Sequence, residues 1–297
     1  MIQSLHKTLP SLTQTALLHI KGDRIDRNRV EAYLRVYQSS SPSYVLLAGI
    51  DQCIRFMAGG RGKEAVERYV DNLKEARREL SGLKHIKLLD ETVVGSCGIF
   101  GLDPGKLVLR RIRQNDAPAH KRCSAMTHFN GSSVKGAGLT GKELYRKLRE
   151  RYHLQPEMCT DAAVTLMTSV NDSRQGFDRL LEAVRELDQE ADQKANQETG
   201  QEMNLKPDKA VVRRSISQAV AAPCGPVPLE ESPGRIAAEL VCPYPPGIPI
   251  LVPGEEITPS CVARIKNCLR QGFEVHGLRM KENRCRISVL DDTQTDL

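Results

Sequence analysis

The segment Ser4-Leu5-His6-Lys7-Thr8-Leu9-Pro10-Ser11-Leu12-Thr13-Gln14-Thr15-Ala16-Leu17-Leu18-His19-Ile20 places one lysine ahead of an uncharged and mostly apolar run. After Lys7 no formally charged residue follows until Lys21. We therefore expect Lys7 to be buried, and burial of an ammonium group lowers its pKa. A neutral lysine amine forms Schiff bases with carbonyl compounds, while Ser4 offers a hydroxyl to a phosphate and His6 offers an imidazole. The alternative is a surface lysine at the start of a core helix.

The residues that follow predict a run of helices. Pro10 favours a helix over 10–20, with apolar residues spaced on one face. Asp26 is typical of a helix N-cap, and Pro42 disfavours helical geometry just before it. The further helices that we expect cover residues 28–38, 43–58 and 62–80.

From about residue 82 the pattern changes to short strands and helices. We expect strands at 106–111, 154–159 and 162–169, a helix over 140–152 opened by a capping box, and another from 172 or 173. This order indicates a small α+β domain. Residues 188–206 are polar and predict a fraying helix end or a linker.

A final module occupies about residues 208–297. Thr258 as N-cap and Pro259 at the first helical position predict a helix that Gly272 ends.

The composition is that of a soluble globular protein, with 40% hydrophobic and 27% charged residues in 297. The aromatic content is 4% without tryptophan, which weighs against base stacking on nucleic acid. Residues 264–286 are the most basic stretch. Glu274 and Glu282 interrupt it, so we expect a solvated face rather than a polyanion site.

The nine cysteines include no C-x-x-C pair, which favours reduced thiols and a cytoplasmic protein. No apolar run reaches the roughly 20 residues that span a bilayer, so we expect no membrane segment. His120, Cys123 and His128 were considered as metal ligands, but their surroundings are typical of a loop and we expect no metal.

Three segments resemble a known family in sequence and in order. They are the Ser-x-His-Lys-x-Leu-Pro segment at 4–10, Gln38-Ser39-Ser40-Ser41-Pro42-Ser43-Tyr44, and Pro243-Tyr244-Pro245-Pro246-Gly247-Ile248-Pro249-Ile250-Leu251-Val252-Pro253-Gly254-Glu255. The chain resembles the Orn/Lys/Arg decarboxylases over nearly its whole length, except for residues 113–138, which look inserted. The resemblance implies an α/β fold: the C-terminal part of a fold-type I pyridoxal-phosphate enzyme.

This family fold divides the chain into four parts. Residues 1–81 would be a remnant of the cofactor-binding large domain and 82–190 the small α+β domain. Residues 191–207 would be a linker and 208–297 a C-terminal decarboxylase module.

The resemblance also implies the cofactor-binding residues. Lys7 would hold pyridoxal 5'-phosphate covalently, Ser4 would bind its phosphate, and His6 would lie beside it and donate a proton. Ser39 or Ser40 would reach across a dimer interface to the neighbour's phosphate. We therefore expect a homodimer or a higher oligomer.

The proline-rich segment indicates a substrate-binding residue. Four prolines within 243–249 fix an extended backbone, which forms a rigid arm able to place Glu255. A substrate with a distal ammonium or guanidinium needs a carboxylate partner, and Glu255 is our candidate, with Glu256 as substitute. The alternative is that both glutamates favour the N-terminal end of the helix at 259.

Two functions follow as hypotheses. The first is decarboxylation of a basic amino acid, with arginine ahead of lysine and ornithine, in polyamine-related metabolism. The alternative is an inactive remnant or accessory subunit that keeps the oligomerisation surface.

The position of Lys7 adds a third expectation. In the family this lysine lies mid-chain, and the groups that contact the cofactor ring come from sequence before it. We therefore expect a missing N-terminal segment, with poor solubility and no activity when the chain is expressed alone.

Overall fold

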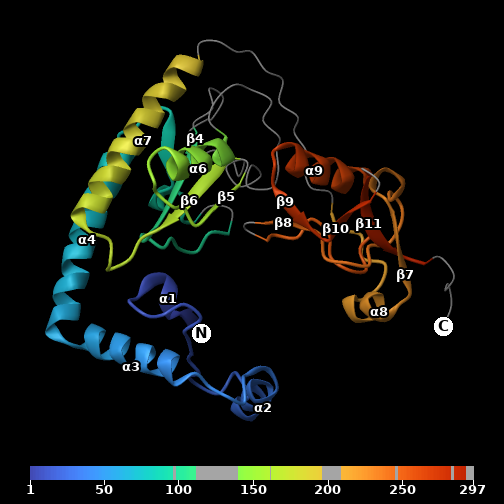
Figure 1. Cartoon of the computed structure of the whole chain (residues 1–297), viewed down its shortest axis with the longest axis horizontal. Coiled ribbons are helices and arrows are strands. Elements are labelled where there is room, and N and C mark those ends of the chain that lie inside the picture. The colour runs from blue at the N-terminus through green and yellow to red at the C-terminus, as the bar shows by residue number, and fades with distance from the viewer. Residues whose placement is uncertain are drawn as a thin grey trace. The chain divides into compact units, whose positions relative to one another are not determined.

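The computed structural model describes residues 1–95, 98–111, 140–160, 162–195, 209–244, 247–281 and 284–291 (Figure 1). The stretch 113–138, with the three residues considered as metal ligands, lies outside these ranges. The chain divides into two compact units. The first contains Met1–Leu83, Asp103–Leu107 and Leu166–Glu186, and the second contains Lys84–Leu102, Val108–Thr165 and Leu187–Leu297. The four parts expected from the sequence, and the three boundaries between them, stay predictions.

The chain begins with a β-hairpin that encloses one helical turn. Its elements are β1 (Ile2–Ser4), α1 (Leu5–Thr8) and β2 (Ala16–Leu18), with β1 and β2 antiparallel. The helix predicted over 10–20 is therefore wrong. Gln14 adopts a φ of 75°, which no helix accommodates, and the Leu5 N–H donates to the Thr15 carbonyl at 3.0 Å. Pairing with β1 thus prevails over the apolar periodicity of the segment.

Three helices follow, as predicted. They are α2 (Arg27–Tyr37), α3 (Tyr44–Ala58) and α4 (Gly60–Ser81). Asp26 and Ser43 cap the first two by accepting backbone N–H groups of the first turn. Between α3 and α4 the chain turns so tightly that a Cβ on Gly62 would lie 2.2 Å from the Phe56 carbonyl oxygen, so only glycine fits there.

A four-stranded sheet has the order β3-β4-β6-β5. Its strands are β3 (Ile86–Leu88), β4 (Lys106–Arg111), β5 (Met158–Cys159) and β6 (Ala163–Met167). The predicted strand at 106–111 is confirmed, β5 is shorter than expected, and β3 was not foreseen. A short 3₁₀ helix, η1 (Glu91–Val93), follows β3.

Helix α6 (Gly141–Glu150) begins with the predicted capping box between Thr140 and Glu143. It buries Leu144 and Leu148. A Cβ on Gly141 would lie 2.2 Å from the Thr160 carbonyl oxygen, so this glycine lets the helix start directly against the β5–β6 turn.

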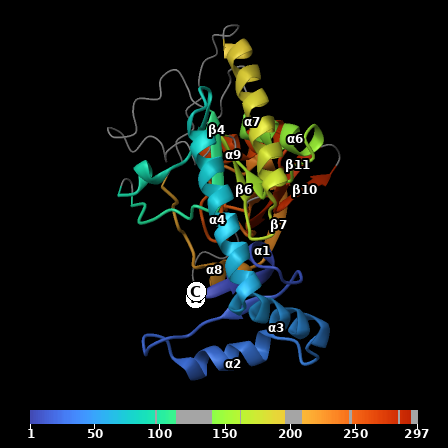
Figure 2. The same cartoon turned by 90° about the vertical axis from the view of Figure 1, so that its left-hand side faces the viewer.

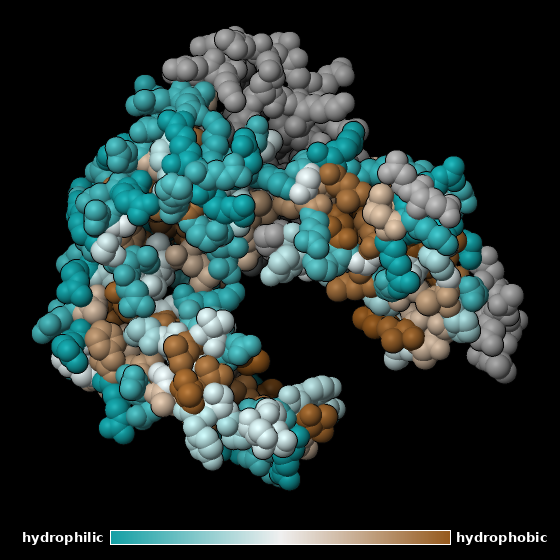
Figure 3. Space-filling view, viewed as in Figure 1, coloured by the Kyte–Doolittle hydropathy of each residue, from teal (hydrophilic) through white to brown (hydrophobic). Residues whose placement is uncertain are grey.

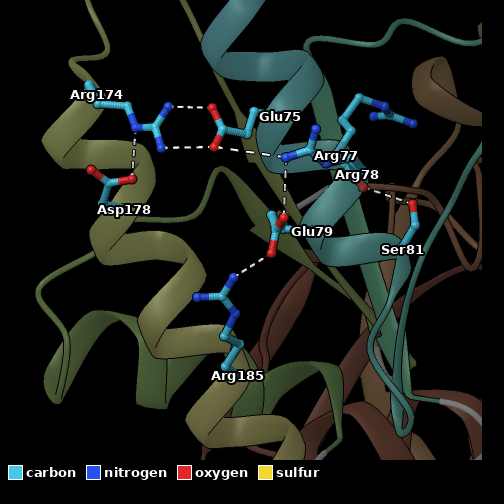
Figure 4. A network of polar contacts seen from close by, with 8 residues as sticks. All are labelled: Glu75, Arg77, Arg78, Glu79, Ser81, Arg174, Asp178 and Arg185. Carbon is cyan, nitrogen blue, oxygen red and sulfur yellow. Dashed lines mark hydrogen bonds and ion pairs between the residues drawn. The ribbon is translucent and has the colours of Figure 1, made fainter.

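Helix α7 (Arg174–Ala195) lies beside α4 in both views (Figures 1 and 2). Ion pairs join the two helices within the first unit: Arg174 with Glu75, and Arg185 with Glu79 at 2.6 Å (Figure 4). The hydrogen bond from Arg174 lowers the pKa of Glu75. Helix α7 buries an apolar face made of Phe177, Leu180, Leu181, Val184 and Leu187.

Asp188 was assigned from sequence to a polar tail, but it is a buried anchor. Its side chain is only 7% exposed. Its carboxylate accepts backbone N–H groups from Lys84 at 3.1 Å, His85 at 2.7 Å and Ile86 at 2.6 Å. The helix continues to Ala195, so part of the predicted fraying end or linker is ordered helix. Residues 196–208 lie outside the described ranges.

The last part of the chain forms two small antiparallel sheets, β10-β11-β7 and β8-β9, with one main apolar cluster and a smaller one at Ala219, Ala238 and Leu290. Thr258 caps α9 with Pro259 in its first turn, and Gly272 follows its end at a φ of 76°, as predicted. The elements are α8 (Ile216–Ala221), β7 (Cys224–Pro228), η2 (Leu229–Glu231), β8 (Cys242–Tyr244), α9 (Pro259–Arg270), β9 (Glu274–His276), β10 (Leu278–Lys281) and β11 (Arg284–Leu290). Across the described residues, no helix is both long and apolar enough to cross a membrane.

Candidate functional site

The predicted cofactor residues lie together on the β1–α1 junction. Ser4 occupies the N-cap position of α1, and its side chain accepts no capping hydrogen bond from the helix. Leu5 is fully buried and anchors the turn. Lys7, two residues further, lies about 200° around the helix axis from Leu5 and is exposed. The expected burial of Lys7 is therefore wrong for this chain.

The imidazole of His6 is oriented by a backbone carbonyl. Its Nδ1 lies 3.0 Å from the Thr15 carbonyl oxygen. Because a carbonyl only accepts, Nδ1 carries the proton, and in the neutral ring Nε2 holds the lone pair. Thr15 is 2% exposed, and its hydroxyl lies 2.7 Å from the Leu12 carbonyl oxygen and 2.8 Å from the Ser11 hydroxyl. The tight loop between α1 and β2 therefore fixes the ring.

The serine segment between α2 and α3 is exposed, and the predicted break in helix there is confirmed. The Ser39 hydroxyl accepts the Ser41 N–H at 3.0 Å and lies 3.2 Å from the Ser41 carbonyl oxygen, so it is engaged in its own turn. Ser40 is the exposed residue at the tip of this turn.

Glu255 belongs to the second unit, where it stabilises a turn. One carboxylate oxygen accepts the Val252 N–H at 2.9 Å, while the Glu255 carbonyl accepts the Ala237 N–H at 2.8 Å. Glu256 instead forms an ion pair with Arg213 at 2.6 Å. Glu256 is thus already neutralised, which leaves Glu255 the better candidate for a cationic ligand.

A groove of about 850 Å³ opens beside the loop that follows α1. Its walls come from that loop and from α3, whose apolar side chains contribute to the brown surface over this part of the molecule (Figure 3). At its base burial raises the pKa of the Cys53 thiol. The lining residues are Pro10, Ser11, Leu12, Val45, Ala48, Gly49, Gln52, Cys53, Phe56 and Asn171.

Sequence reasoning missed this groove. The one signal is the uncharged run at 43–50, which by itself indicates only the helix predicted over 43–58. In the structure α3 buries only Cys53 among its residues. A close approach also shapes the groove, because a Cβ on Gly49 would lie 3.1 Å from the Leu12 side chain.

Within one turn of the chain the β1–α1 junction therefore offers a hydroxyl from Ser4, an oriented imidazole from His6 and a primary amine from Lys7.

Residues 1–176 match the model of the Orn/Lys/Arg decarboxylase major domain, and residues 189–289 match that of the Orn/Lys/Arg decarboxylase C-terminal domain. The chain belongs to the Orn/Lys/Arg decarboxylase family. The resemblance expected from the three sequence segments is confirmed.

Individual relatives agree with the family. An arginine decarboxylase of Bacillus subtilis is 30% identical over 274 residues, covering 92% of this chain and 51% of the relative. The constitutive lysine decarboxylase of Escherichia coli is 24% identical, covering 86% and 43%. The chain thus spans about half the length of the curated relatives it matches.

Solved structures share the fold. The lysine decarboxylase of Francisella novicida superposes with a TM-score of 0.71 at 18% identity, over 98% of this chain and 48% of its own. The Escherichia coli constitutive lysine decarboxylase gives the same TM-score at 17% identity, over 98% and 49%. The expected α/β fold, consistent with fold-type I enzymes, is confirmed.

Proposed function

We propose that this chain contributes the covalent cofactor anchor to a pyridoxal-phosphate-dependent decarboxylase of basic amino acids. The observation that carries the proposal is the junction of β1 and α1, where Ser4, His6 and Lys7 stand within one turn in a member of this family. The chain spans about half of its relatives, so the activity is proposed for the complete pocket to which these residues belong.

The donor set fits pyridoxal phosphate. The Ser4 hydroxyl is not used to cap α1, so it can donate to a phosphate oxygen, and the exposed Lys7 carries the primary amine that an aldehyde requires. When bound, this cofactor supplies an electron sink for the bond that breaks at the substrate α-carbon.

The chain's own residues would bind and move protons. Lys7 would hold the aldehyde carbon and release it to the substrate amine. His6 would accept or donate a proton at Nε2, because the Thr15 carbonyl holds the proton at Nδ1. Ser4 would fix the phosphate and with it the orientation of the reacting bond.

Glu255 would bind the distal cation of the substrate. Its carboxylate is half-buried and bonded to one backbone N–H, which fixes its direction. Among the substrates we place arginine first, because the relatives named arginine decarboxylase reach 30% identity whereas those named lysine decarboxylase reach 24%. The amine product would enter polyamine-related metabolism.

A homodimer or higher oligomer is part of the proposal. Helix α2 buries none of its residues, and α3 leaves Tyr44 80% and Val45 71% exposed. Such an apolar surface favours a second copy, and the exposed Ser40 would then reach the neighbour's phosphate. The cytoplasmic location stays a prediction from the cysteine content.

Covalent labelling tests the anchor without requiring turnover. The chain is incubated with pyridoxal phosphate, reduced with borohydride and digested, and the label is located by mass spectrometry. We expect the label on Lys7 and its loss in Lys7→Ala, while Lys21→Ala, which removes a nearby lysine, keeps it. Equal labelling of Lys7→Ala would contradict the proposal.

Carbon dioxide release from arginine, lysine and ornithine, measured on a complete-length form of the enzyme, tests the activity. We expect Glu255→Gln to raise KM while labelling of Lys7 is kept. Label on Lys7 without release from any of the three would favour the inactive or accessory form.

A further inference from the structure

The hairpin of β10 and β11 gathers basic residues on one face. In its register Arg279 lies opposite Arg286, and Lys281 lies opposite Arg284. Directly opposed residues share a face, as do residues two apart along a strand. All four cations therefore lie on the same face of the hairpin, labelled in Figure 2.

This cationic face, defined by Arg279, Lys281, Arg284 and Arg286, points away from the core. Among the alternate residues, Ile287 is 1% exposed and Leu278 packs against the same apolar cluster, whereas Met280 near the end of β10 is 70% exposed. The sequence alone predicted a solvated face here, because acidic residues interrupt the basic stretch. The strand register brings these four cations together, which the order of residues along the chain does not reveal.

Like charges directly opposite each other destabilise a strand pair. Two carboxylates offset part of this repulsion. Glu239 pairs with Arg279 at 2.7 Å. Glu230 pairs with Lys266 at 2.9 Å; the hydrogen bond from Lys266 lowers the pKa of Glu230, and attraction to Arg284 adds a smaller contribution. Within the described residues, the four cations of this face have these two carboxylates nearby, and one of the two also pairs with Lys266. The face therefore keeps an excess of positive charge, which an anionic partner would neutralise.

Strand β10, which carries Arg279 and Lys281, lies at an edge of its sheet. In the sheet order β10-β11-β7 the two outer strands are β10 and β7. Strand β7 contains Pro226 and Pro228, which have no N–H to donate to an added strand. Strand β10 has no proline, so its outer side can pair with another extended segment.

The charge decides which segment fits. A second copy of β10 would place cations against cations, and edge lysines deter such self-pairing. We propose that β10 binds an extended acidic segment of a partner protein as an added strand, with carboxylates at alternate positions facing Arg279 and Lys281. This inference is independent of the proposed decarboxylation.

Fluorescence anisotropy with a labelled peptide of alternating Glu and Thr tests the inference on the full chain. We expect saturable binding that weakens as salt rises, because the pairs are exposed. Lys281→Glu combined with Arg284→Glu should weaken binding at least about tenfold. Arg149→Glu, which reverses an exposed cation on α6, should leave it unchanged.

Two further probes separate strand addition from simple charge attraction. The same peptide N-methylated at alternate residues should lose affinity, because it cannot complete the backbone ladder. Undiminished binding of that peptide, together with equally tight binding of inorganic triphosphate, would indicate a general anion patch and overturn the inference. Equal affinity of the double charge-reversal variant would also overturn it.

Discussion

The α4–α7 pair, with α7 counted up to Glu186, and the α2–α3 pair lie in the same compact unit and differ in how they bury apolar surface. Helix α4 buries Leu73, Ala76 and Leu80, and ion pairs to α7 run along its solvent side. Helices α2 and α3 together bury only Cys53. Asp26 and Ser43 cap α2 and α3, whereas Gly59 at the start of α4 offers no side-chain cap. The difference teaches that local helix signals form a helix whether or not its apolar face has a partner within the chain.

The sharpest test of this comparison is a matched pair of leucine truncations. Leu80 on α4 is 1% exposed, whereas Leu47 on α3 is 48% exposed. We expect Leu80→Ala to lower the free energy of unfolding by about 3 kcal/mol, through lost burial and a cavity. Leu47→Ala should change it by less than about 0.5 kcal/mol. Urea unfolding followed by circular dichroism measures both, and equal losses would mean that α3 is covered within the chain.

Asp188, near the C-terminal end of α7, tests how much a buried polar contact of this helix contributes to stability. Asp188→Asn keeps the shape but offers an NH₂ group to N–H donors of residues 84–86, so we expect a loss of about 2–3 kcal/mol in unfolding free energy. Asp178→Asn on the same helix is the control, since its side chain is 52% exposed and pairs with Arg174. Hydrogen exchange of the amides at 84–86 should accelerate only in Asp188→Asn. Unchanged exchange there would contradict the anchoring role.

The α2–α3 region is tested through self-association. Val45→Glu introduces a charge on the apolar face of α3, where Val45 is 71% exposed. If a second copy covers this face, the dissociation constant of the dimer should rise at least tenfold, or about 1.4 kcal/mol. Sedimentation velocity over a range of concentrations measures it, with Arg68→Glu on α4 as the charge control. Identical dissociation constants for the two variants would mean that the dimer interface does not include this face of α3.

The sequence predicted those elements whose signals are local. The cap residues Asp26, Thr140 and Thr258 and the alternation at 106–111 each act within a few residues of the chain, and the structure agrees with all four. The helix predicted over 10–20 is wrong because residues 16–18 pair with β1. The spacing of apolar residues within 10–20 does not reveal this hydrogen-bond partner outside the segment.

The site was predictable only in part, for the same reason. The resemblance indicated Ser4, His6 and Lys7, and the structure places them on one junction, but their roles stay predictions. The orientation of His6 depends on the Thr15 carbonyl, and the burial of Asp188 depends on amides about a hundred residues away. Neither contact leaves a pattern in the sequence around the residue concerned.

The smallest expected effect concerns the ion pairs of Glu190 on α7 with Lys147 and Arg151, and their response to pH. The hydrogen bond from Lys147, with a further one from Arg151, lowers the pKa of Glu190. A carboxylate whose pKa is lower in the folded state stabilises the protein above its unfolded pKa of about 4.3, and this stability is lost as the pH falls through the folded value. Glu190→Gln should therefore cost about 1 kcal/mol at pH 7, since the side chain is partly screened by solvent, and less at about pH 3. Urea unfolding of both proteins at these two pH values measures the difference. A difference that stays constant between them would show that Glu190 acts through packing rather than charge.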